Sequence, residues 1–579
     1  MSNFLAPYWF MYGDEPRLDQ TGEFLVIDTE TTGLRWTDNI IGIALAWRVS
    51  GTGDLKSCYF SGSPRSPLFS DNIWSKERLN DLLVEIFDKK SVVGQYFSFD
   101  ARVIFRDFGI VPRKSFDTWH MAKSLSFRSS YSLKNLAKDI GINDESWFNM
   151  KEVRGKLSKQ NPVEVAEYAR KDALYTMQVF DSLMGEYELL PNYQDDIDFT
   201  YLTYSIMARG FPLNEELLEK RLEDETSRYK ELQTMFANKG LDNTNSPVKV
   251  MRFLKANSIF PENTSAEGLA PYAKYPLVEQ LITAKQLQSN INSRLEVFRD
   301  YKKNGRLHSE WHPFGTASYR MVAKDPNLMA QPLKDRGERS YEPLAALFTN
   351  EKSYVLQLDI AQAEVRLAAM LSRCNGLAEI LSKGGDVYMQ MAQIAYGEAN
   401  KENRQKAKRA TLASIYEEGP SSFSQSHGVS MQEAMDVLDQ FRRVFPEIKS
   451  MSNAYSEFAQ KNGFINLYTG RKIHFDKQDN RLYRAFNQEV QGGLAEIMRT
   501  FMLAMDKEFP GRIIGQIHDS LILEFDRDDV SVEMIEEVKA TAIRILNESL
   551  PENVKSLTTP EIPMILDCEA FVPIFNEEI

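Results

Sequence analysis

Residues 24–34 read Phe-Leu-Val-Ile-Asp-Thr-Glu-Thr-Thr-Gly-Leu. The apolar residues before Asp28 predict a short buried strand that ends at an acidic residue. Asp28 and Glu30 are two positions apart, so on a strand their side chains project to the same face. The stretch therefore predicts a sheet that carries a pair of carboxylates at the end of one strand.

The sequence on both sides of this stretch alternates between strand and helix patterns. Pro162 opens the last helix at a position where proline is favoured. Alternation of this kind predicts an α/β domain over about residues 20–190, preceded by an aromatic, turn-rich arm at 1–19. The strand patterns cover 40–47, 58–60 and 91–94, and the helix patterns cover 76–87, 100–108 and 162–188.

Two more acids and a tyrosine extend the carboxylate pattern. Asp100 follows the strand at 91–94, while Tyr168 and Asp172 are four apart on a helix and therefore share one face. Carboxylates ~4 Å apart repel by about 4 kcal/mol at an effective dielectric of ~20, so such a cluster needs cations. Oxygen ligands favour Mg²⁺ or Mn²⁺, and two such ions suit phosphodiester hydrolysis. Asp100 or Asp172 taken singly could equally be a solvated surface group. The pair Asp28 and Glu30 at a strand end argues against that reading, and the ordered set favours a metal site in which Tyr168 orients water.

A second group of motifs lies in the C-terminal half. The strand pattern 354–358 delivers Asp359 to its end, and a helix pattern follows at 363–371. Asp519 lies between two apolar runs, 513–517 and 521–525, which predict a hairpin with polar residues at its tip. Two aspartates brought together by the fold would hold two metal ions for phosphoryl transfer.

A basic helix pattern lies between these two aspartates. Arg404, Lys408, Leu412 and Tyr416 recur every four residues and form one ridge of a helix. The two cations suit a triphosphate, and the apolar and aromatic pair suits a sugar and a base. An isolated helix of this kind is more often simply amphipathic with a solvated basic face, but the flanking motifs favour a nucleotide site.

These motifs resemble two known groups of enzymes. The first set resembles the DEDD superfamily of 3′→5′ exonucleases, in the subclass with a tyrosine in its last motif. The later motifs resemble motifs A, B and C of family A DNA polymerases, the group of bacterial DNA polymerase I and many phage replicative enzymes. Other segments are also similar to that family and occur in the family's order along the chain. They lie at 245–247, 316–320, 325–328, 463–471 and 487–493.

The resemblance implies an α+β multidomain protein, with an RNase H-like α/β exonuclease domain followed by a right-hand polymerase. It implies template-directed DNA synthesis with proofreading, on primer–template DNA, a single-stranded 3′ end and dNTPs. We therefore expect no amino-terminal 5′ nuclease domain. The expected domains are the arm at 1–19, the exonuclease at 20–190, the thumb at 200–305, the palm at 306–395 and 485–579, and the fingers at 396–484.

The resemblance also assigns roles to single residues. Two Mg²⁺ ions per active site, replaceable by Mn²⁺, would be held in the polymerase by Asp359, Asp519 and the carbonyl of Ile360. In the exonuclease they would be held by Asp28, Glu30, Asp100 and Asp172. Glu364 would exclude a 2′-hydroxyl. The nucleotide site would contain Ile360, Gln362, Glu364, Arg404, Lys408, Leu412 and Tyr416. DNA would contact Arg320, Asn487, Gln491, Gln516 and His518.

The sequence departs from the family pattern at several of these motifs. We expect the differences to change details of the fingers site and not the reaction class. Tyr319 and Glu417 replace glycines, Ser520 replaces a glutamate, Tyr388 replaces a common histidine and Leu412 replaces an aromatic residue.

Charge and composition exclude some classes of protein. The formal net charge of −13 argues against a simple DNA-coating protein, although not against an enzyme with one basic cleft. Three separated cysteines exclude a disulfide framework or a Cys-rich zinc site. No apolar run reaches the length of a membrane span. We therefore expect a monomer in the cytoplasm of a bacterial or phage-infected cell, with other replication proteins as partners.

Three other functions fit parts of the sequence. A single-subunit RNA polymerase shares motifs of this type, but Glu364 and the exonuclease motifs argue against it. An exonuclease with an inactive polymerase half is opposed by the intact Asp359, Lys408 and Asp519. A non-catalytic DNA-binding subunit would need neither set of carboxylates.

Overall fold

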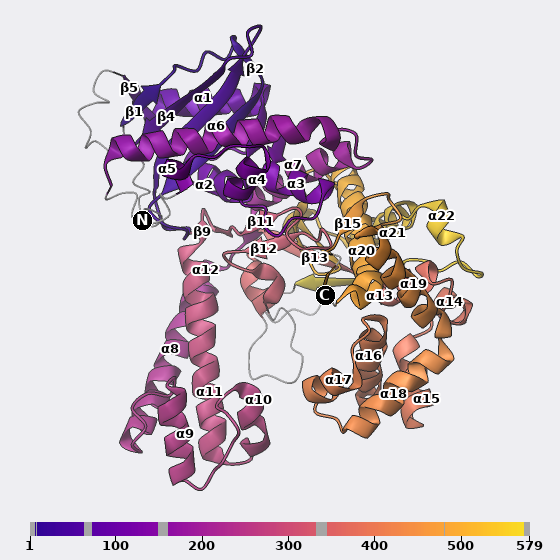
Figure 1. Ribbon diagram of the computed structural model, residues 1–579. Helices are drawn as coiled ribbons and strands as arrows, with labels where there is room; N and C mark the ends of the chain where they lie inside the picture. Colours follow the sequence, from indigo (N-terminus) through magenta and orange to yellow (C-terminus); the bar gives the residue numbers. More distant parts are fainter. Residues whose placement is uncertain are drawn as a thin grey trace.

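The computed structural model describes residues 6, 8–62, 72–148, 160–331, 344–476, 478–479 and 481–571. Residues 1–5 and 7 of the expected arm lie outside the described residues. The N-terminal α/β region sits at one end of the molecule, and two helical arms project from the other end (Figure 1). The expected multidomain α+β fold is confirmed.

A mixed seven-stranded sheet organises the N-terminal region, in the order β5-β1-β4-β3-β2-β6-β7. The interior strand β2 pairs parallel with β6 and antiparallel with β3, and β6 is also parallel to β7. The predicted strand at 24–28 is longer than expected, because β2 continues past both acids. The strands are β1 (Tyr8–Gly13), β2 (Thr21–Thr31), β3 (Ile40–Val49), β4 (Leu55–Ser61), β5 (Ile73–Ser75), β6 (Ser91–Gly94) and β7 (Ser115–Asp117).

Helices cover this sheet, and α6 lies across β2, β3 and β4. Asn161 caps α6 by accepting a hydrogen bond from the backbone of Val163, and Pro162 occupies its first turn. Ala166, Ala169 and Ala173 are fully buried, which allows α6 to approach the sheet closely. The helices are α1 (Lys76–Lys89), α2 (Ser98–Phe108), α3 (Thr118–Leu125), α4 (Leu133–Asp139), α5 (Glu145–Phe148) and α6 (Pro162–Tyr187).

The first helical arm follows the connecting helix α7 (Tyr193–Arg209). Its long helices α8 and α11 pack together, and α9 and α10 lie near its tip (Figure 1). The helical stretch from α11 to α12 is interrupted by a π-helical turn at Ile291–Leu295 and ends at Asp300. The helices are α8 (Glu215–Asn238), α9 (Pro247–Ala256), α10 (Ala266–Leu269), α11 (Pro276–Asn290) and α12 (Glu296–Asp300).

An antiparallel four-stranded sheet forms the base of the C-terminal region, in the order β16-β17-β13-β18. It contains β13 (Ser353–Ile360), β16 (Ile513–Ile517), β17 (Ser520–Asp526) and β18 (Leu566–Phe571). The helix α13 packs against α20, which in turn packs against α21. These helices are α13 (Ala363–Leu371), α20 (Ala485–Glu508) and α21 (Val532–Glu548).

The second helical arm contains α15 to α18. The chain forms two helices, α18 and α19, on either side of Phe445, because Pro446 lacks an N–H and cannot continue α18. The basic helix α16 ends at Ile415, and the short helix α17 follows it. The helices are α14 (Asn375–Ser382), α15 (Val387–Tyr396), α16 (Lys401–Ile415), α17 (Pro420–His427), α18 (Met431–Val444) and α19 (Pro446–Asn462).

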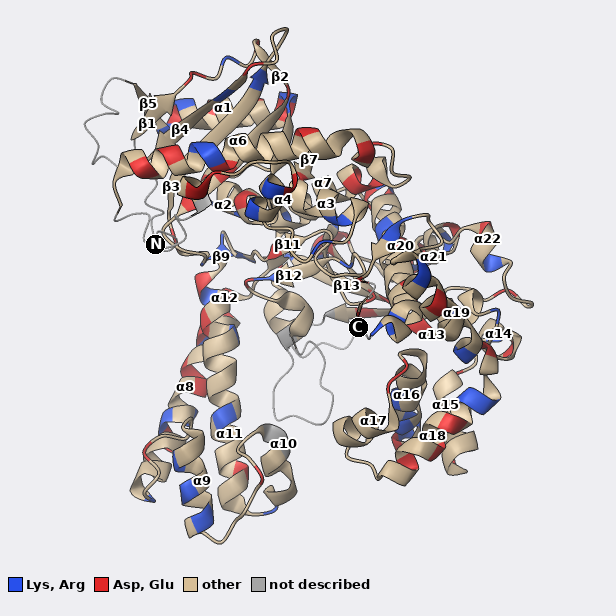
Figure 2. Cartoon of the chain, viewed as in Figure 1, with Lys and Arg blue, Asp and Glu red and all other residues tan. Residues whose placement is uncertain are grey.

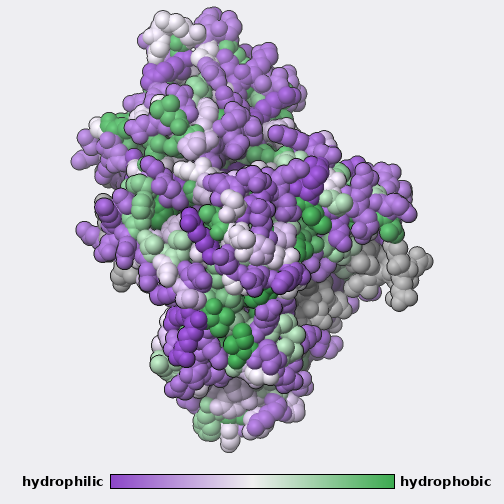
Figure 3. Space-filling model, turned by 90° about the vertical axis from the view of Figure 1, so that its right-hand side faces the viewer, coloured by the Kyte–Doolittle hydropathy of each residue, from purple (hydrophilic) through white to green (hydrophobic). Residues whose placement is uncertain are grey.

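Small elements join these regions. The strands β8, β10 and β9 form one small sheet, while β11 pairs with β12 and β14 with β15. Among the described residues, no helix is both long and apolar enough to cross a membrane. The face in Figure 3 is mainly hydrophilic, with hydrophobic groups in small patches. The elements are β8 (Phe211–Pro212), β9 (Lys302–Lys303), β10 (Arg306–Leu307), β11 (Glu310–His312), β12 (Val322–Lys324), β14 (Phe464–Asn466), β15 (Lys472–His474) and α22 (Glu552–Lys555).

Candidate active sites

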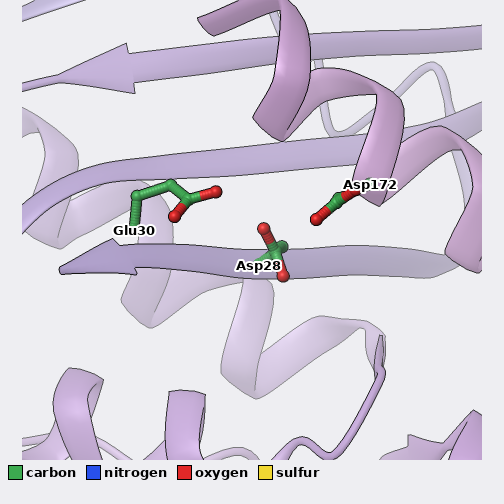
Figure 4. A group of neighbouring side chains, drawn as sticks. All are labelled: Asp28, Glu30 and Asp172. Carbon is green, nitrogen blue, oxygen red and sulfur yellow. The ribbon is translucent and has the colours of Figure 1, made fainter. Parts of the chain in front are cut away.

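The N-terminal sheet carries a cluster of three carboxylates. Asp28 and Glu30 lie on β2, and Asp172 reaches them from α6 (Figure 4). One oxygen of each lies within 4.8 Å of the others, and the side chains of Glu30 and Asp172 are buried. Because like charges this close repel strongly, the arrangement suits an ion that neutralises them. The strand spacing predicts that Asp28 and Glu30 share a face, and the fold brings Asp172 to them from α6.

Asp100 and Tyr168 line the same pocket as the three carboxylates. Asp100 lies at the start of α2, outside the group of three, and accepts hydrogen bonds from Thr29 through the backbone N–H (2.8 Å) and the hydroxyl (2.6 Å). Burial raises the pKa of Asp100 to about 7. A bound cation would favour the ionised form. All five residues predicted for this site therefore face one pocket.

Trp147 is a residue of this site that the sequence did not indicate. It lies on the short helix α5, and its indole N–H donates a hydrogen bond to Oδ1 of Asp172. Asp144 fixes this segment over α6, since it accepts hydrogen bonds from Lys171 at 2.6 Å and from the Tyr175 hydroxyl at 2.8 Å. The indole thus orients the Asp172 carboxylate, which lines the pocket.

The second site lies at the end of the C-terminal sheet. Asp359 on β13 pairs in register with Ser520 on β17, and Asp519 occupies the adjoining turn. The Ser520 hydroxyl donates to Asp359 Oδ1, and the N–H of Ile360 donates to the Asp519 carbonyl at 3.2 Å. Burial raises the pKa of Asp519 to about 6, against the opposing effect of Arg320. The hairpin therefore brings the two aspartates together as expected.

Arg320 links the aspartate pair to the first turn of α13. Its Nη2 atom lies 3.3 Å from Glu364 Oε1 and 3.7 Å from Asp519 Oδ1. The Tyr416 hydroxyl also hydrogen-bonds to Glu364, and burial together with this carboxylate raises the Tyr416 pKa. Glu364 is therefore held at the aspartates by residues from two other elements.

The basic helix α16 faces α15. Arg404 Nε donates a hydrogen bond to Asp386 Oδ2 at 2.6 Å. The Arg404 guanidinium lies 5.4 Å and the Lys408 ammonium 5.7 Å from the centre of the Tyr388 ring. Lys408 is exposed, and Leu412 is half-buried further along the same helix. The side chains of α15 thus hold the cations of α16 in place.

The remaining predicted residues lie just before α13, on and after β16, and on α20. Gln362, with φ of 53°, accepts a hydrogen bond from the backbone N–H of Val387 at 3.3 Å. Gln516 donates to the carbonyl of His518 at 2.8 Å, which braces the hairpin turn. Asn487 and Gln491 are half-buried on the first turns of α20.

Comparisons with known proteins agree with this geometry. A family model described as DNA polymerase family A matches residues 216–560, which is more than half of the chain. The chain belongs to DNA polymerase family A. A second model, described as 3'-5' exonuclease, matches residues 18–188. The resemblances to family A polymerases and to 3′→5′ exonucleases are confirmed.

Several family A proteins are similar over long stretches. DNA polymerase I of Aquifex aeolicus is 22% identical, over 93% of this chain and 95% of that protein. DNA polymerase I of Borreliella burgdorferi is 22% identical over 92% of this chain, and the match spans 62% of that protein. For Helicobacter pylori DNA polymerase I, identity is 26% over 54% of this chain and 36% of that protein. The chain therefore spans only part of several family A relatives.

A solved family A structure has the same fold. The POL domain of Pol1 from M. smegmatis, in complex with DNA primer-template and dNTP, matches with a TM-score of 0.69. Sequence identity is 17%, and the match covers 94% of each chain. This likeness concerns the fold alone.

The departures from the family A motifs have visible consequences. Tyr319 and Glu417 have φ of 59° and 56°, a conformation that glycine adopts without strain. Lys449 donates a hydrogen bond to Glu417 at 2.6 Å. Ser520 replaces a carboxylate by a hydroxyl that donates to Asp359. Position 520 therefore offers the aspartates a hydrogen-bond donor where the family pattern has a carboxylate.

Proposed function

We propose that this chain is a DNA-directed DNA polymerase that also removes mispaired 3′ ends with its N-terminal exonuclease domain. The observation that carries the proposal is the pairing of Asp359 with Asp519 beside the basic helix α16. Family membership and the separate carboxylate pocket on β2 and α6 support it. The substrates would be primer–template DNA and dNTPs.

The polymerase residues would divide the work of nucleotide addition. Asp359, Asp519 and the carbonyl of Ile360 would hold two Mg²⁺ ions, which supply Lewis-acid stabilisation of charge on the reacting phosphate. Arg404 and Lys408 would bind the triphosphate, and Leu412 and Tyr416 would pack against the nucleotide. The Arg404 side chain donates a hydrogen bond to Asp386 in this structure, so a bound triphosphate would replace Asp386 as the anion that Arg404 contacts.

The palm residues would select the correct substrate. Glu364, held by Arg320 and Tyr416, would occupy the space of a 2′-hydroxyl and exclude ribonucleotides. Arg320, Asn487 and Gln491 would contact minor-groove acceptors, which differ little between base pairs and so report correct pairing. Gln516 and His518 would hold the primer end at the hairpin.

The exonuclease residues would cleave the last phosphodiester of a frayed primer. Asp28, Glu30, Asp100 and Asp172 would hold two Mg²⁺ ions, and Tyr168 would orient the attacking water. A mismatched end would reach this pocket more often, because it loses pairing and stacking.

The helical arms would enclose the DNA. We propose that the thumb (200–305) contains α8, α9 and α11, that the fingers (396–484) contain α16 to α19, and that the palm (306–395 and 485–579) contains the four-stranded sheet. Lys and Arg residues gather on α9 and α16 (Figure 2), where DNA and triphosphate phosphates would lie. Monomeric state, cytoplasmic location and a phage or bacterial source stay predictions.

A primer extension assay tests the proposed function. A primer labelled at its 5′ end, annealed to a longer template, is incubated with Mg²⁺ and the protein. We expect extension with dNTPs, shortening without them and little extension with rNTPs. Efficient use of rNTPs would favour an RNA polymerase, and shortening alone would favour an exonuclease with an inactive polymerase half. Absence of both extension and shortening would refute the proposal.

DNA binding is expected to depend strongly on salt despite the net charge of −13. Phosphate contacts release counterions, so affinity should fall about a hundredfold or more between ~50 and ~200 mM salt. Fluorescence anisotropy of a labelled primer–template measures this slope. Lys255→Met, an exposed change on α9, should reduce the slope by about one, whereas Lys89→Met, an exposed change on α1, should leave it unchanged. A flat affinity would contradict a basic DNA cleft.

Replacing Trp147 by Phe is expected to slow hydrolysis of single-stranded DNA about tenfold, because Asp172 loses the donor that orients it. A titration of initial rate against Mg²⁺ should show recovery at high metal concentration. Primer extension should stay at the wild-type rate. Trp74→Phe is the matched control, since its indole N–H donates to Asn72 instead. Equal rates at every Mg²⁺ concentration would exclude this role.

A further inference from the structure

The N-terminal domain makes direct contact with the segment that carries Arg320. Lys123, on α3, is 8% exposed and crosses the junction between the two regions. Its ammonium donates a hydrogen bond to the carbonyl of Phe314 at 3.1 Å and another to the carbonyl of Thr316. A buried ammonium with these acceptors fixes the path of the segment after β11.

The same segment positions the Arg320 backbone. The N–H of Arg320 donates to the Thr316 hydroxyl at 3.0 Å, so the residue bound by Lys123 also holds Arg320. The guanidinium of Arg320 then reaches Glu364 at 3.3 Å and Asp519 at 3.7 Å. A continuous series of polar contacts therefore runs from α3 to the aspartate pair.

Tyr319 is the second residue of this junction. It is 1% exposed and has φ of 59°, although bulky residues avoid this conformation unless their surroundings impose it. Its hydroxyl donates to the carbonyls of Lys472 at 3.2 Å and Lys123 at 3.4 Å. The Lys123 ammonium lies 4.2 Å from the centre of its ring. Tyr319 thus fills the junction where a glycine would leave space.

A buried ionic cluster lies next to the junction between the N-terminal region and the segment that carries Arg320. Arg471 pairs with Asp196 of the connecting helix α7 and lies 2.6 Å from Glu496 of α20. Arg499 contacts the same Glu496 at 2.5 Å and donates to the Tyr319 carbonyl at 3.4 Å. Because all of these groups are buried and paired, the two regions have little freedom to shift at this point.

We propose that Lys123 and Tyr319 are positioning residues through which the exonuclease domain holds Arg320 at the polymerase site. The inference rests on the proposed function, because Arg320 matters to the reaction only if this site extends primers. It assigns the exonuclease domain a second role besides hydrolysis. Extension of correctly paired primers depends on contacts made by α3, more than 190 positions away in the sequence from Thr316.

The test compares Lys123→Met and Tyr319→Phe with wild type. Met keeps most of the length of the side chain without its charge or donors, and Phe keeps the ring without the hydroxyl. Single-turnover extension is measured from matched and mismatched primer ends, with hydrolysis of single-stranded DNA and the thermal unfolding midpoint measured in parallel. Lys89→Met is the control, since Lys89 is exposed on α1 and pairs with exposed Glu85 of the same helix.

We expect extension from a matched end to fall about three- to thirtyfold in Lys123→Met, and less in Tyr319→Phe. Extension from a mismatched end should fall less, so the ratio of the two rates decreases. Partial unfolding cannot change this ratio, because loss of folded protein lowers the matched and the mismatched extension by the same factor. Hydrolysis should stay within about twofold of wild type.

A double-mutant cycle with Arg320→Ala completes the test. If Lys123 acts through Arg320, Lys123→Met should cause no further loss in the Arg320→Ala background. Additive losses, or a matched-to-mismatched ratio equal to wild type in both single variants, would overturn the inference. Absence of extension by the wild-type protein would instead refute the proposed function.

Discussion

Asp359→Asn is expected to abolish primer extension and to leave hydrolysis of single-stranded DNA intact. The amide keeps the shape of the side chain and can still accept the hydrogen bond from Ser520, so the sheet should not change. The negative charge that would hold the ions is lost. If those ions contribute about 4 kcal/mol or more to the transition state, extension falls about a thousandfold or more. Single-nucleotide incorporation under single-turnover conditions measures this loss.

Asp526→Asn is the matched control for this change. Asp526 lies at the opposite end of β17, is exposed and pairs with Arg512 at 3.1 Å. It should extend primers at the wild-type rate. Extension by Asp359→Asn at more than about a tenth of that rate would rule out the proposed metal site at the end of β13.

Part of the carboxylate cluster could be predicted from local spacing in the sequence. Asp28 and Glu30 share a strand face, but the meeting of Asp172 on α6 with β2 joins distant segments and was implied only by the resemblance to known exonucleases. Asp359 and Asp519 needed more information, because their strands are far apart in the sequence. Only the resemblance to known polymerases paired them, and the register of β13 with β17 gives the physical reason.

The residues that sequence reasoning missed depend on contacts between distant segments. Trp147 meets Asp172 only because Asp144 ties α5 to α6. Tyr319 was noticed as a departure from glycine, but its contacts with Lys123 and Lys472 require three separate elements to meet. No local pattern encodes such contacts. The break before Pro446, in contrast, follows from proline chemistry and could have been predicted.

The net charge describes only the average over the whole chain and does not show where acidic and basic residues gather. The acids that would bind metal lie in buried or half-buried pockets, whereas Lys408 is exposed on α16. A negative total therefore coexists with a local basic surface. This separation is a property of the fold, and composition cannot report it.

Asp28→Ala is expected to abolish hydrolysis of the primer strand while extension continues at the wild-type rate. Asp28 lies between Glu30 and Asp172, and its oxygen is within 4.8 Å of a ligand oxygen of each (Figure 4). Its removal leaves two carboxylates that cannot surround an ion in the same way, so hydrolysis should fall about a thousandfold. Shortening of a labelled single strand without dNTPs measures the loss.

The contrast between this variant and Asp359→Asn is what separates the two sites. Asp54→Ala, an exposed change in the loop after β3, controls for general damage to the domain and should hydrolyse DNA normally. If Asp28→Ala loses hydrolysis alone, newly made DNA should contain more mismatches, because extension continues without removal of errors. If it loses both activities, the two pockets cannot act independently. If it loses neither, the carboxylate cluster on β2 and α6 is not the hydrolytic site.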